Sequence, residues 1–233
     1  MQSIYFVDSN FTYESSKKSI LSIRYATDGF SFCVHDEKDK LVVFVHEPYA
    51  ADSREAAVAR LKNYVVIDAI LNLRFKKVYI MPCFKEKLLV PGAFFDKTNI
   101  ATLYAVNQEV SPDDTILYHH IEGIEAYLVE TVISSFHDFV REHFPVFQIV
   151  NGAYPFILGA MGKALRDTEQ IFLDIQDHYF DLLFIQDSRI QLFNSFSYKA
   201  MTDIVYFVLN CIKECEIKQE KIHLSICGPA IKD

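Results

Sequence analysis

A pattern of three short apolar runs separated by polar turns occurs twice in the chain. The first copy, LSIRYATDGFSFCVHDEKDKLVVFV, begins at Leu21, and the second, IFLDIQDHYFDLLFIQDSRIQLFNSF, begins at Ile171. Each copy is followed by a stretch with apolar residues at helical spacing and by one more apolar run. Removing one residue from the second turn aligns the copies, so that Arg24 matches Asp174. We therefore predict a duplicated β-β-β-α-β unit, with two like domains flanking a cleft.

The elements expected along the chain follow from these runs. Residues up to Lys18 are polar and weakly patterned, and Asp52 with Glu55 suggests a capping box at the start of a helix. The expected strands are 19–25, 30–35, 41–46, 77–81, 115–120, 126–129, 146–150, 170–175, 178–185, 190–193 and 222–227. The expected helices are 52–73, 132–143, 154–165 and 199–216.

These elements divide the chain into two predicted units. Residues 1–145 form the first unit, with a less regular insertion at about 84–122, and residues 146–233 form the second. The first unit has a further helix and strand after the point that corresponds to Gly228, whereas the sequence ends five residues after that glycine. We therefore expect the second unit to be incomplete at its C-terminus, or the natural chain to extend beyond Asp233.

Composition narrows the class of protein. A content of 51% hydrophobic residues, with only 7 Gly and 7 Pro, indicates an ordered α/β chain with a substantial core. The net charge of -8 argues against nucleic-acid binding, which relies on Lys and Arg to neutralise phosphates. Five cysteines without a Cys-x-x-Cys pair are typical of a reducing cytoplasm. The N-terminus does not resemble a signal peptide and the apolar runs are short, so we expect a soluble cytoplasmic protein without membrane insertion.

The order of the predicted elements resembles that of the duplicated ribonuclease H-like fold of actin-like ATPases, and the insertion is similar to that of cell-division and pilus-assembly members. More specifically, LSIRYATDGFSF together with LFNSFSYKAMTDIVYFVL resembles a bacterial family of unknown function with this fold. In that family an Asn-x-Phe-x-Tyr segment leads into a helix that opens with Asp and continues with Tyr. The matching positions here are Asn194, Phe196, Tyr198, Asp203 and Tyr206.

The resemblance implies where an ATPase would hold its phosphates. Such enzymes use glycine-bearing hairpins, because backbone N–H groups reach a phosphate only where no Cβ intrudes. They also place an Asp at the end of the first strand of each unit to handle the metal. Here Arg24 replaces the first Asp, whereas Asp174 is retained but is followed by no glycine. We therefore expect no catalytic residues, no metal site and no required cofactor.

Three functions remain open. The leading hypothesis is a non-catalytic scaffold or adaptor with an unknown protein partner and an undetermined oligomeric state. The first alternative is a divergent nucleotide-binding switch, and only this alternative would involve ATP and Mg²⁺. The competing structural explanation is that the candidate residues, which lie in turns and at strand ends, only form hydrogen bonds with local backbone groups. The second alternative is a small-molecule kinase-like enzyme. The candidate ligand-binding residues are Arg24, Thr27, Asp174, Gln176, Asn194 and Gly228.

Two pairs of residues carry further expectations. Arg24 and Asp174 have opposite charges, so we expect them to pair directly or through water. Asn194 and Asp203 flank a predicted turn and helix start, where their side chains would bond to the backbone or complement the helix dipole. For Asn194→Ala this implies a loss of about 1 kcal/mol of stability.

Overall fold

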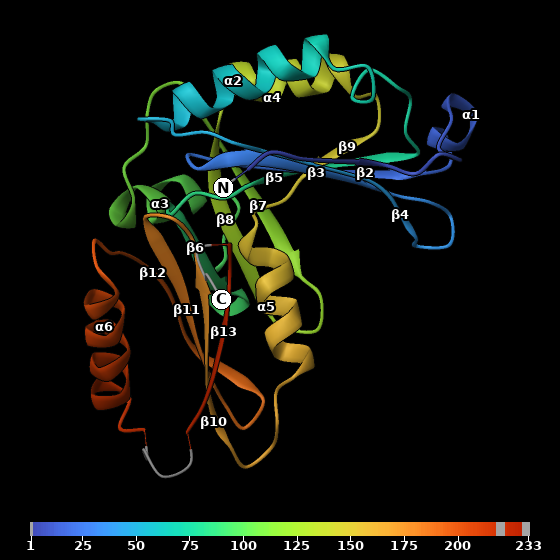
Figure 1. The fold of residues 1–233 in the computed structure, drawn as a ribbon. Coiled ribbons are helices and arrows are strands. Elements are labelled where there is room, and N and C mark those ends of the chain that lie inside the picture. The colour runs from blue at the N-terminus through green and yellow to red at the C-terminus, as the bar shows by residue number, and fades with distance from the viewer. Residues whose placement is uncertain (1, 218–221, 230–233) are drawn as a thin grey trace. The chain divides into compact units, whose positions relative to one another are not determined.

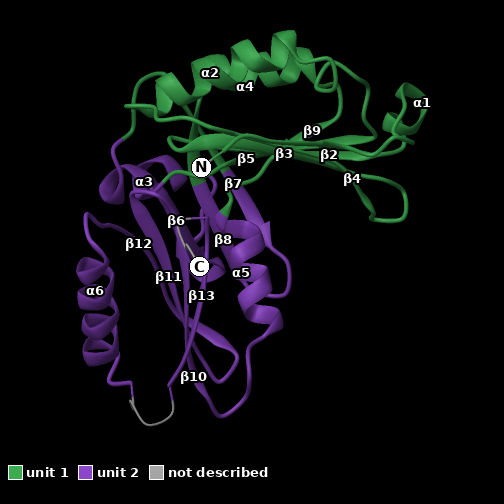
Figure 2. Cartoon of the chain, viewed as in Figure 1, with its two compact units in different colours: residues 1–84, 110–117, 130–152 green, residues 85–109, 118–129, 153–233 purple. Residues whose placement is uncertain are grey.

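The computed structural model describes residues 2–217 and 222–229 of the chain. These residues form two compact units, shown in separate colours in Figure 2. Unit 1 comprises residues 1–84, 110–117 and 130–152, and unit 2 comprises residues 85–109, 118–129 and 153–233. Within the described residues, no helix combines the length and apolar character that crossing a membrane would require.

Unit 1 is built on a six-stranded sheet with the order β1-β4-β3-β2-β5-β9. Helices α2 and α4 cover the same face of this sheet (Figure 1), and both contribute apolar side chains to its core. The strands are β1 (Ile4–Val7), β2 (Ile20–Ala26), β3 (Gly29–His35), β4 (Leu41–Pro48), β5 (Lys77–Pro82) and β9 (Phe147–Ile149), and the helices are α1 (Tyr13–Ser16), α2 (Arg54–Ile67) and α4 (Ser134–His143).

Unit 2 is built on a four-stranded sheet with the order β12-β11-β10-β13. Helix α6 packs on one face of this sheet and α5 on the other (Figure 1), and each face has its own apolar core. The strands are β10 (Glu169–Ile175), β11 (Tyr179–Gln186), β12 (Arg189–Ser197) and β13 (Ile222–Cys227), and the helices are α5 (Ala153–Gly162) and α6 (Met201–Glu214).

A smaller sheet with the order β6-β8-β7 precedes these elements in the chain. Its strands are β6 (Lys87–Pro91), β7 (Asp114–Ile121) and β8 (Ala126–Ile133), accompanied by the short η1 (Gly92–Phe94) and by α3 (Ile100–Asn107). Strand β6 and residues 118–129 belong to unit 2, whereas 114–117 and 130–133 belong to unit 1.

The duplication predicted from the sequence is confirmed in the topology and in the register. Strands β2, β3 and β4 form an antiparallel meander with β5 parallel to β2, and β10 to β13 repeat this arrangement. Both meanders also contain a β-bulge at the equivalent place. The bulge leaves Val42 of β4 without an opposite residue on β3, and Gln191 of β12 without an opposite residue on β11. The two units therefore share an irregularity as well as an order of strands.

Other features differ from the sequence-based expectations. Residues 85–109 and 118–129 group with unit 2, which differs from the predicted division at residues 145 and 146. The physical reason is that β6 contributes Lys87 to an ion pair with Asp181 of β11, and that Ile121 and Leu128 pack in one core with Leu183 of the same strand. The N-terminal residues, expected to be unpatterned, form β1 and α1. Helix α2 begins after Ser53, whose Oγ accepts a hydrogen bond from Ala56 N at 3.1 Å, so the expected cap at Asp52 is wrong.

Candidate functional site

The two units place Arg24 and Asp174 at equivalent register positions of their sheets. Arg24 on β2 lies opposite Ser31 on β3, and Asp174 on β10 lies opposite Asp181 on β11. In an ATPase of the fold anticipated from the sequence, both positions would carry the acidic residue that faces a metal–phosphate group. We therefore take these two sheet positions as the candidate site and describe each within its own unit.

In unit 1, Arg24 forms an ion pair inside its own hairpin. Its two terminal nitrogens donate to the two carboxylate oxygens of Asp28 at 3.2 and 3.3 Å, and each side chain is 19% exposed. The carbonyl oxygens of Thr27 and Asp28 accept hydrogen bonds from Ala51 N and Tyr49 N. The turn that would have to wrap a phosphate thus uses its charges and carbonyl groups locally. The expected pairing of Arg24 with Asp174 stays a prediction.

Gly29, which follows this turn, has a packing role that explains its identity. Its φ is +144°, and a Cβ at this position would lie 2.6 Å from the carbonyl oxygen of Glu47 on β4. Only glycine accommodates both the backbone conformation and the close approach of β4. A phosphate ligand is therefore not needed to account for this glycine.

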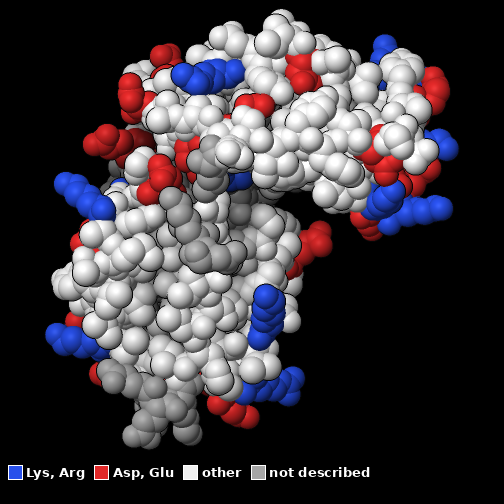
Figure 3. All heavy atoms as spheres, in the orientation of Figure 1, with Lys and Arg blue, Asp and Glu red and all other residues white. Residues whose placement is uncertain are grey.

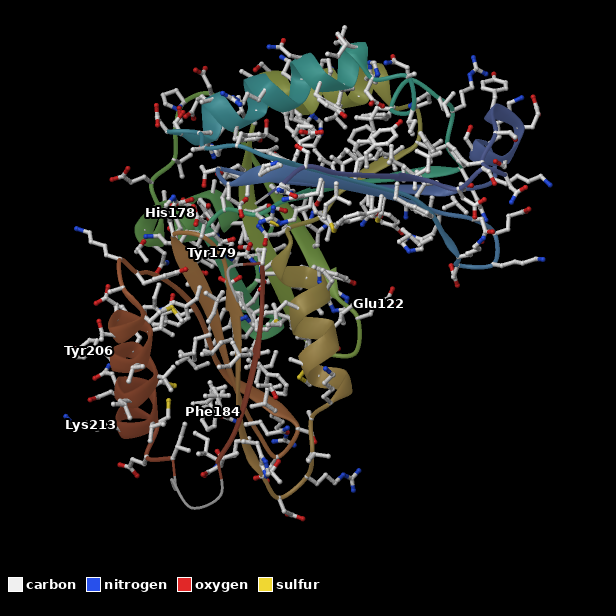
Figure 4. All side chains as sticks on the ribbon, in the orientation of Figure 1. Glu122, His178, Tyr179, Phe184, Tyr206 and Lys213 are labelled. Carbon is white, nitrogen blue, oxygen red and sulfur yellow. The ribbon has the colours of Figure 1, made fainter. Side chains whose placement is uncertain are left out.

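In unit 2, Asp181 belongs to a buried polar cluster and was not among the predicted site residues. Lys87 Nζ lies 2.8 Å from Asp181 Oδ1, and the two side chains are 1% and 2% exposed. Ser195 Oγ on β12 donates a hydrogen bond to the same oxygen at 2.6 Å. The ring of Tyr179, at the start of β11 (Figure 4), lies 4.6 Å from the ammonium group. Lys87 thus supplies a counter-charge from within the chain to the carboxylate of Asp181, which lies opposite Asp174.

Asp174, Gln176 and Gly228 come together at the ends of β10 and β13. Gly228 has a φ of +118°, and a Cβ there would lie 2.5 Å from Ile175 N and 2.8 Å from Asp174 Oδ1. Burial, assisted by the nearby Asp174 carboxylate, raises the pKa of the Cys227 thiol to about 11, so this thiol is protonated at neutral pH. The structure therefore brings three of the predicted site residues into one place and excludes a side chain from the centre of it.

The hairpin after Asp174 closes on itself. Gln176 N donates to the carbonyl oxygen of Tyr179 at 2.9 Å, and the carbonyl oxygen of Gln176 accepts from the hydroxyl of Tyr198 at 2.6 Å. The backbone N–H of Tyr198 also binds the carbonyl oxygen of His178. These contacts tie the hairpin to the end of β12, so its backbone already has partners within the unit.

Asn194 lies outside this group, and the turn predicted around it is wrong. Strand β12 continues to Ser197, and exposed Asn194 lies opposite Leu182, one position away from the row that contains Asp181 and Ser195. Its Oδ1 accepts a hydrogen bond from Ser195 N, as expected of a side chain that satisfies local backbone. Asp203 also meets its expected structural role, because hydrogen bonds from Lys199 N and Ala200 N lower the pKa of its carboxyl group.

The arrangement limits the chemistry that the described residues can perform. Two carboxylates, those of Asp174 and Asp181, lie on neighbouring strands of one sheet face, but a buried ammonium already pairs with the second. Among the described residues, no group of three or more His, Cys, Asp or Glu side chains is placed to hold a metal ion. Charged side chains of both signs are scattered over the face shown in Figure 3, without a continuous basic band. Neither metal-assisted transfer nor nucleic-acid binding gains support from these groups.

Similar solved structures agree with the duplicated architecture. A Bacteroides thetaiotaomicron protein of unknown function with an actin-like ATPase fold matches with a TM-score of 0.87 and 24% identity, over 96% of this chain and 86% of that chain. A chain of a PilM–PilN type IV pilus biogenesis complex matches with a TM-score of 0.50 and 12% identity, over 87% of this chain and 67% of that chain. No curated protein matches the sequence.

These likenesses show the fold that the sequence resemblance implied. The chain has the actin-like ATPase fold, in which a ribonuclease H-like unit is duplicated. The family of unknown function that carries this fold is also identified, because its sequence pattern extends over residues 8–233. The chain belongs to DUF3822, a protein family of unknown function.

Proposed function

We propose that this chain is a non-catalytic module of the actin-like fold that acts by binding another protein. The observation that carries the proposal is that cations of the chain itself pair with carboxylates at the first candidate position and directly beside the second. Arg24 pairs with Asp28 in unit 1, and Lys87 pairs with Asp181 in unit 2. Each cation belongs to the chain and is covalently retained, so the carboxylates of Asp28 and Asp181 do not depend on a metal ion for charge balance.

The glycines support the same reading. Gly29 and Gly228 both have positive φ, and both approach neighbouring backbone too closely for a side chain. The lack of a side chain at both positions allows close packing between strands within each unit, and a nucleotide is not required to explain it. A protein-binding role for this fold has a precedent, since one similar chain is part of the PilM–PilN complex. That likeness is one of fold.

A nucleotide-binding switch is the alternative that a specific observation favours. Asp174 and Gly228 lie together at the ends of two parallel strands, where a Cβ at Gly228 would come within 2.8 Å of Asp174 Oδ1. Ligands of α/β sheets commonly bind at such strand ends. Under this alternative, Asp174 would direct the cation that accompanies the phosphates.

A thermal-shift assay separates the two functions. We expect no change in Tm with millimolar Mg-ATP or Mg-ADP. A ligand present at about 100 times its Kd would instead add about 2.7 kcal/mol to the free energy of unfolding and raise Tm clearly.

Two variants make this assay specific. If a shift occurs and Asp174→Asn removes it, whereas Asp177→Asn retains it, the switch replaces the proposed function. Asp177 is the matched control because it lies on the same hairpin with its side chain 54% exposed. A shift that both variants retain would place the nucleotide away from this site and would leave the neutralised positions as described.

A further inference from the structure

A groove in unit 2 runs beside the first half of β12 and has a volume of about 460 Å³. This volume is within the range of protein sites that bind small ligands or short segments. Its lining includes the apolar residues Phe193 and Ile190 of β12, Leu89 of β6 and Met161 of α5, together with the charged residues Arg189 and Glu125. All of these residues belong to unit 2.

The groove borders the edge strand of a sheet. Within the described residues, strand β12 is the outermost strand of its sheet and pairs only with β11, while β6 packs against it without pairing. Its counterpart in unit 1, β4, is covered on the corresponding side by β1, which runs antiparallel to it. Val7 of β1 lies opposite Val43, and the equivalent of Val43 in unit 2 is Leu192. Unit 1 thus shows what kind of segment this edge of the repeat accepts.

The shared bulge marks the contact point. In unit 1 the N–H of Asp8, the residue after β1, donates to the carbonyl oxygen of Val42 at 2.8 Å. Val42 is the bulged residue of β4, and Gln191 is the bulged residue of β12. Bulges often protect a sheet edge from additional strands. Here unit 1 demonstrates that this particular bulge is compatible with a docked strand.

A charged pair at the end of β1 indicates the orientation expected of a segment that docks on β12. The carboxylate of Asp8 lies 2.6 Å from Lys40 Nζ, which precedes β4. Arg189 occupies the position equivalent to Lys40, because both residues precede the bulge by two positions and lie across from the last residues of the preceding strand. Among the described residues, no carboxylate lies within 4 Å of the Arg189 guanidinium group. The groove therefore presents the Arg189 cation at the position where unit 1, whose edge strand β4 is paired with β1, has the Asp8–Lys40 ion pair.

We propose that this groove binds an extended segment of a partner protein, antiparallel to β12, with two apolar residues followed by an acidic residue that reaches Arg189. The inference deepens the proposed binding function and rests on it. A separate protein is the occupant we favour, because the β1 strand of each copy of this chain already pairs with its own β4 and its Asp8 with its own Lys40. A second copy therefore has no equivalent segment to donate without opening unit 1.

The chain itself supplies a suitable probe for this site. Residues 3–10, SIYFVDSN, contain the apolar–apolar–acidic sequence that β1 places against β4. We expect a fluorescein-labelled SIYFVDSN peptide to bind the full chain saturably, as measured by fluorescence anisotropy. Arg189→Glu should weaken this binding by about tenfold or more, since it turns an attraction into a repulsion. Lys213→Glu is the matched charge reversal, because Lys213 projects from the outer side of α6 with its side chain 81% exposed (Figure 4).

A charge-swapped peptide completes the experiment. SIYFVKSN should bind Arg189→Glu more tightly than it binds the original chain, and this rescue would exclude general damage to the variant. Equal binding of SIYFVDSN to both proteins, or no saturable binding, would overturn the proposal. Loss of binding in Lys40→Glu but not in Arg189→Glu would mean exchange with β1 and would also overturn it. Self-association of the chain that Arg189→Glu abolishes would make a second copy the occupant. None of these results depends on nucleotide, so the neutralised sites are tested separately.

Discussion

The equivalent sheet rows of the two units differ in charge although their backbones correspond. In unit 1 the row across β5, β2, β3 and β4 reads Met81, Arg24, Ser31 and His46, and in unit 2 the row across β13, β10, β11 and β12 reads Cys227, Asp174, Asp181 and Ser195. Unit 1 neutralises its row with a residue of the adjoining turn. In unit 2 a lysine from a different sheet pairs with one of the two carboxylates of the row, that of Asp181. The two repeats therefore share their strand geometry, whereas the charged residues of each row and their partners differ.

The depth of burial distinguishes the two solutions most clearly. The pair Arg24–Asp28 is 19% exposed at both ends, whereas Lys87 and Asp181 are almost completely buried. Lys87→Met should therefore lower the free energy of unfolding by about 3–5 kcal/mol, because it leaves a carboxylate buried without its counter-charge. Arg24→Met should lower it by only about 1 kcal/mol, since water still reaches Asp28. Urea unfolding of both variants measures the difference.

A double variant checks the cause of this effect. Lys87→Met combined with Asp181→Leu removes both charges and should recover most of the lost stability. If the double variant is as unstable as Lys87→Met alone, the lysine contributes mainly through packing. In that case the contrast between the two rows is one of volume instead of charge.

The strands after the helices provide a second contrast. Ile80 of β5 and Ile226 of β13 are at equivalent positions, but they are 1% and 51% exposed. Ile80 packs in the same core as Phe136 of α4, a helix for which the described part of unit 2 has no counterpart. Ile80→Ala should therefore cost about 3 kcal/mol, and Ile226→Ala about 1 kcal/mol. Similar losses in urea unfolding would show that Ile226 is covered in solution.

Adjacent residues of β12 sharpen the assignment of the polar row. Ser195→Ala removes a hydrogen bond to the buried carboxylate of Asp181 and should cost about 2 kcal/mol. Asn194→Ala removes a local bond at an exposed position and should cost less than about 0.5 kcal/mol. The latter value replaces the larger loss that the predicted turn implied. A larger loss of stability for Asn194→Ala than for Ser195→Ala, in thermal or urea unfolding, would mean that Asn194 and not Ser195 belongs to the polar row.

The smallest expected effect concerns acid stability at β1. The hydrogen bond from Lys40, followed by that from Asn10 N, lowers the pKa of Asp8 to about 2. A lowered pKa stabilises the folded state above the unfolded pKa of about 3.9, and this stabilisation is lost as pH falls through about 2. Lys40→Met should raise the Asp8 pKa and release β1 at a higher pH.

NMR titration of the Asp8 carboxyl group, with hydrogen exchange of the β1 amides, measures both changes. The charge reversal Lys213→Glu should leave the titration unaffected. An Asp8 pKa that stays near 2 in Lys40→Met would show that the backbone N–H of Asn10 alone is responsible. The comparison of Lys40 with Arg189 would then lose its electrostatic basis.

The sequence predicted the repeat because each meander keeps its own alternation of apolar and polar residues. Phe30 and Phe180 follow equivalent turns, and both face the helices of their units. The sequence did not predict β6, since Leu88-Leu89-Val90 is too short to distinguish a strand from a loop before Pro91. Residues Ile4–Val7 form a strand without alternation because β1 is an edge strand whose four residues are all exposed.

The candidate site was harder to predict than the fold. Asp181 was visible as a lone carboxylate in the apolar run from Phe180 to Ile185, a signal that a buried partner should exist. Its partner Lys87 is distant in the chain, and only the packing of β6 brings the two together. Asn194 was placed in a turn because Asn-Ser-Phe-Ser is polar, whereas alternating polar residues are also typical of an edge strand.

The bulge shared by the two repeats indicates that they have a common origin. Regular strands arise independently in many folds, but the same extra residue at the same register, Val42 in one repeat and Gln191 in the other, points to inheritance from one ancestral half. The turns that precede these residues differ by one residue in length, so turn length changed after the halves diverged while the bulge persisted. Hairpins 29–48 and 179–197 are in this sense interchangeable parts, and a chimaera that exchanges only their turns should keep every inward side chain inward.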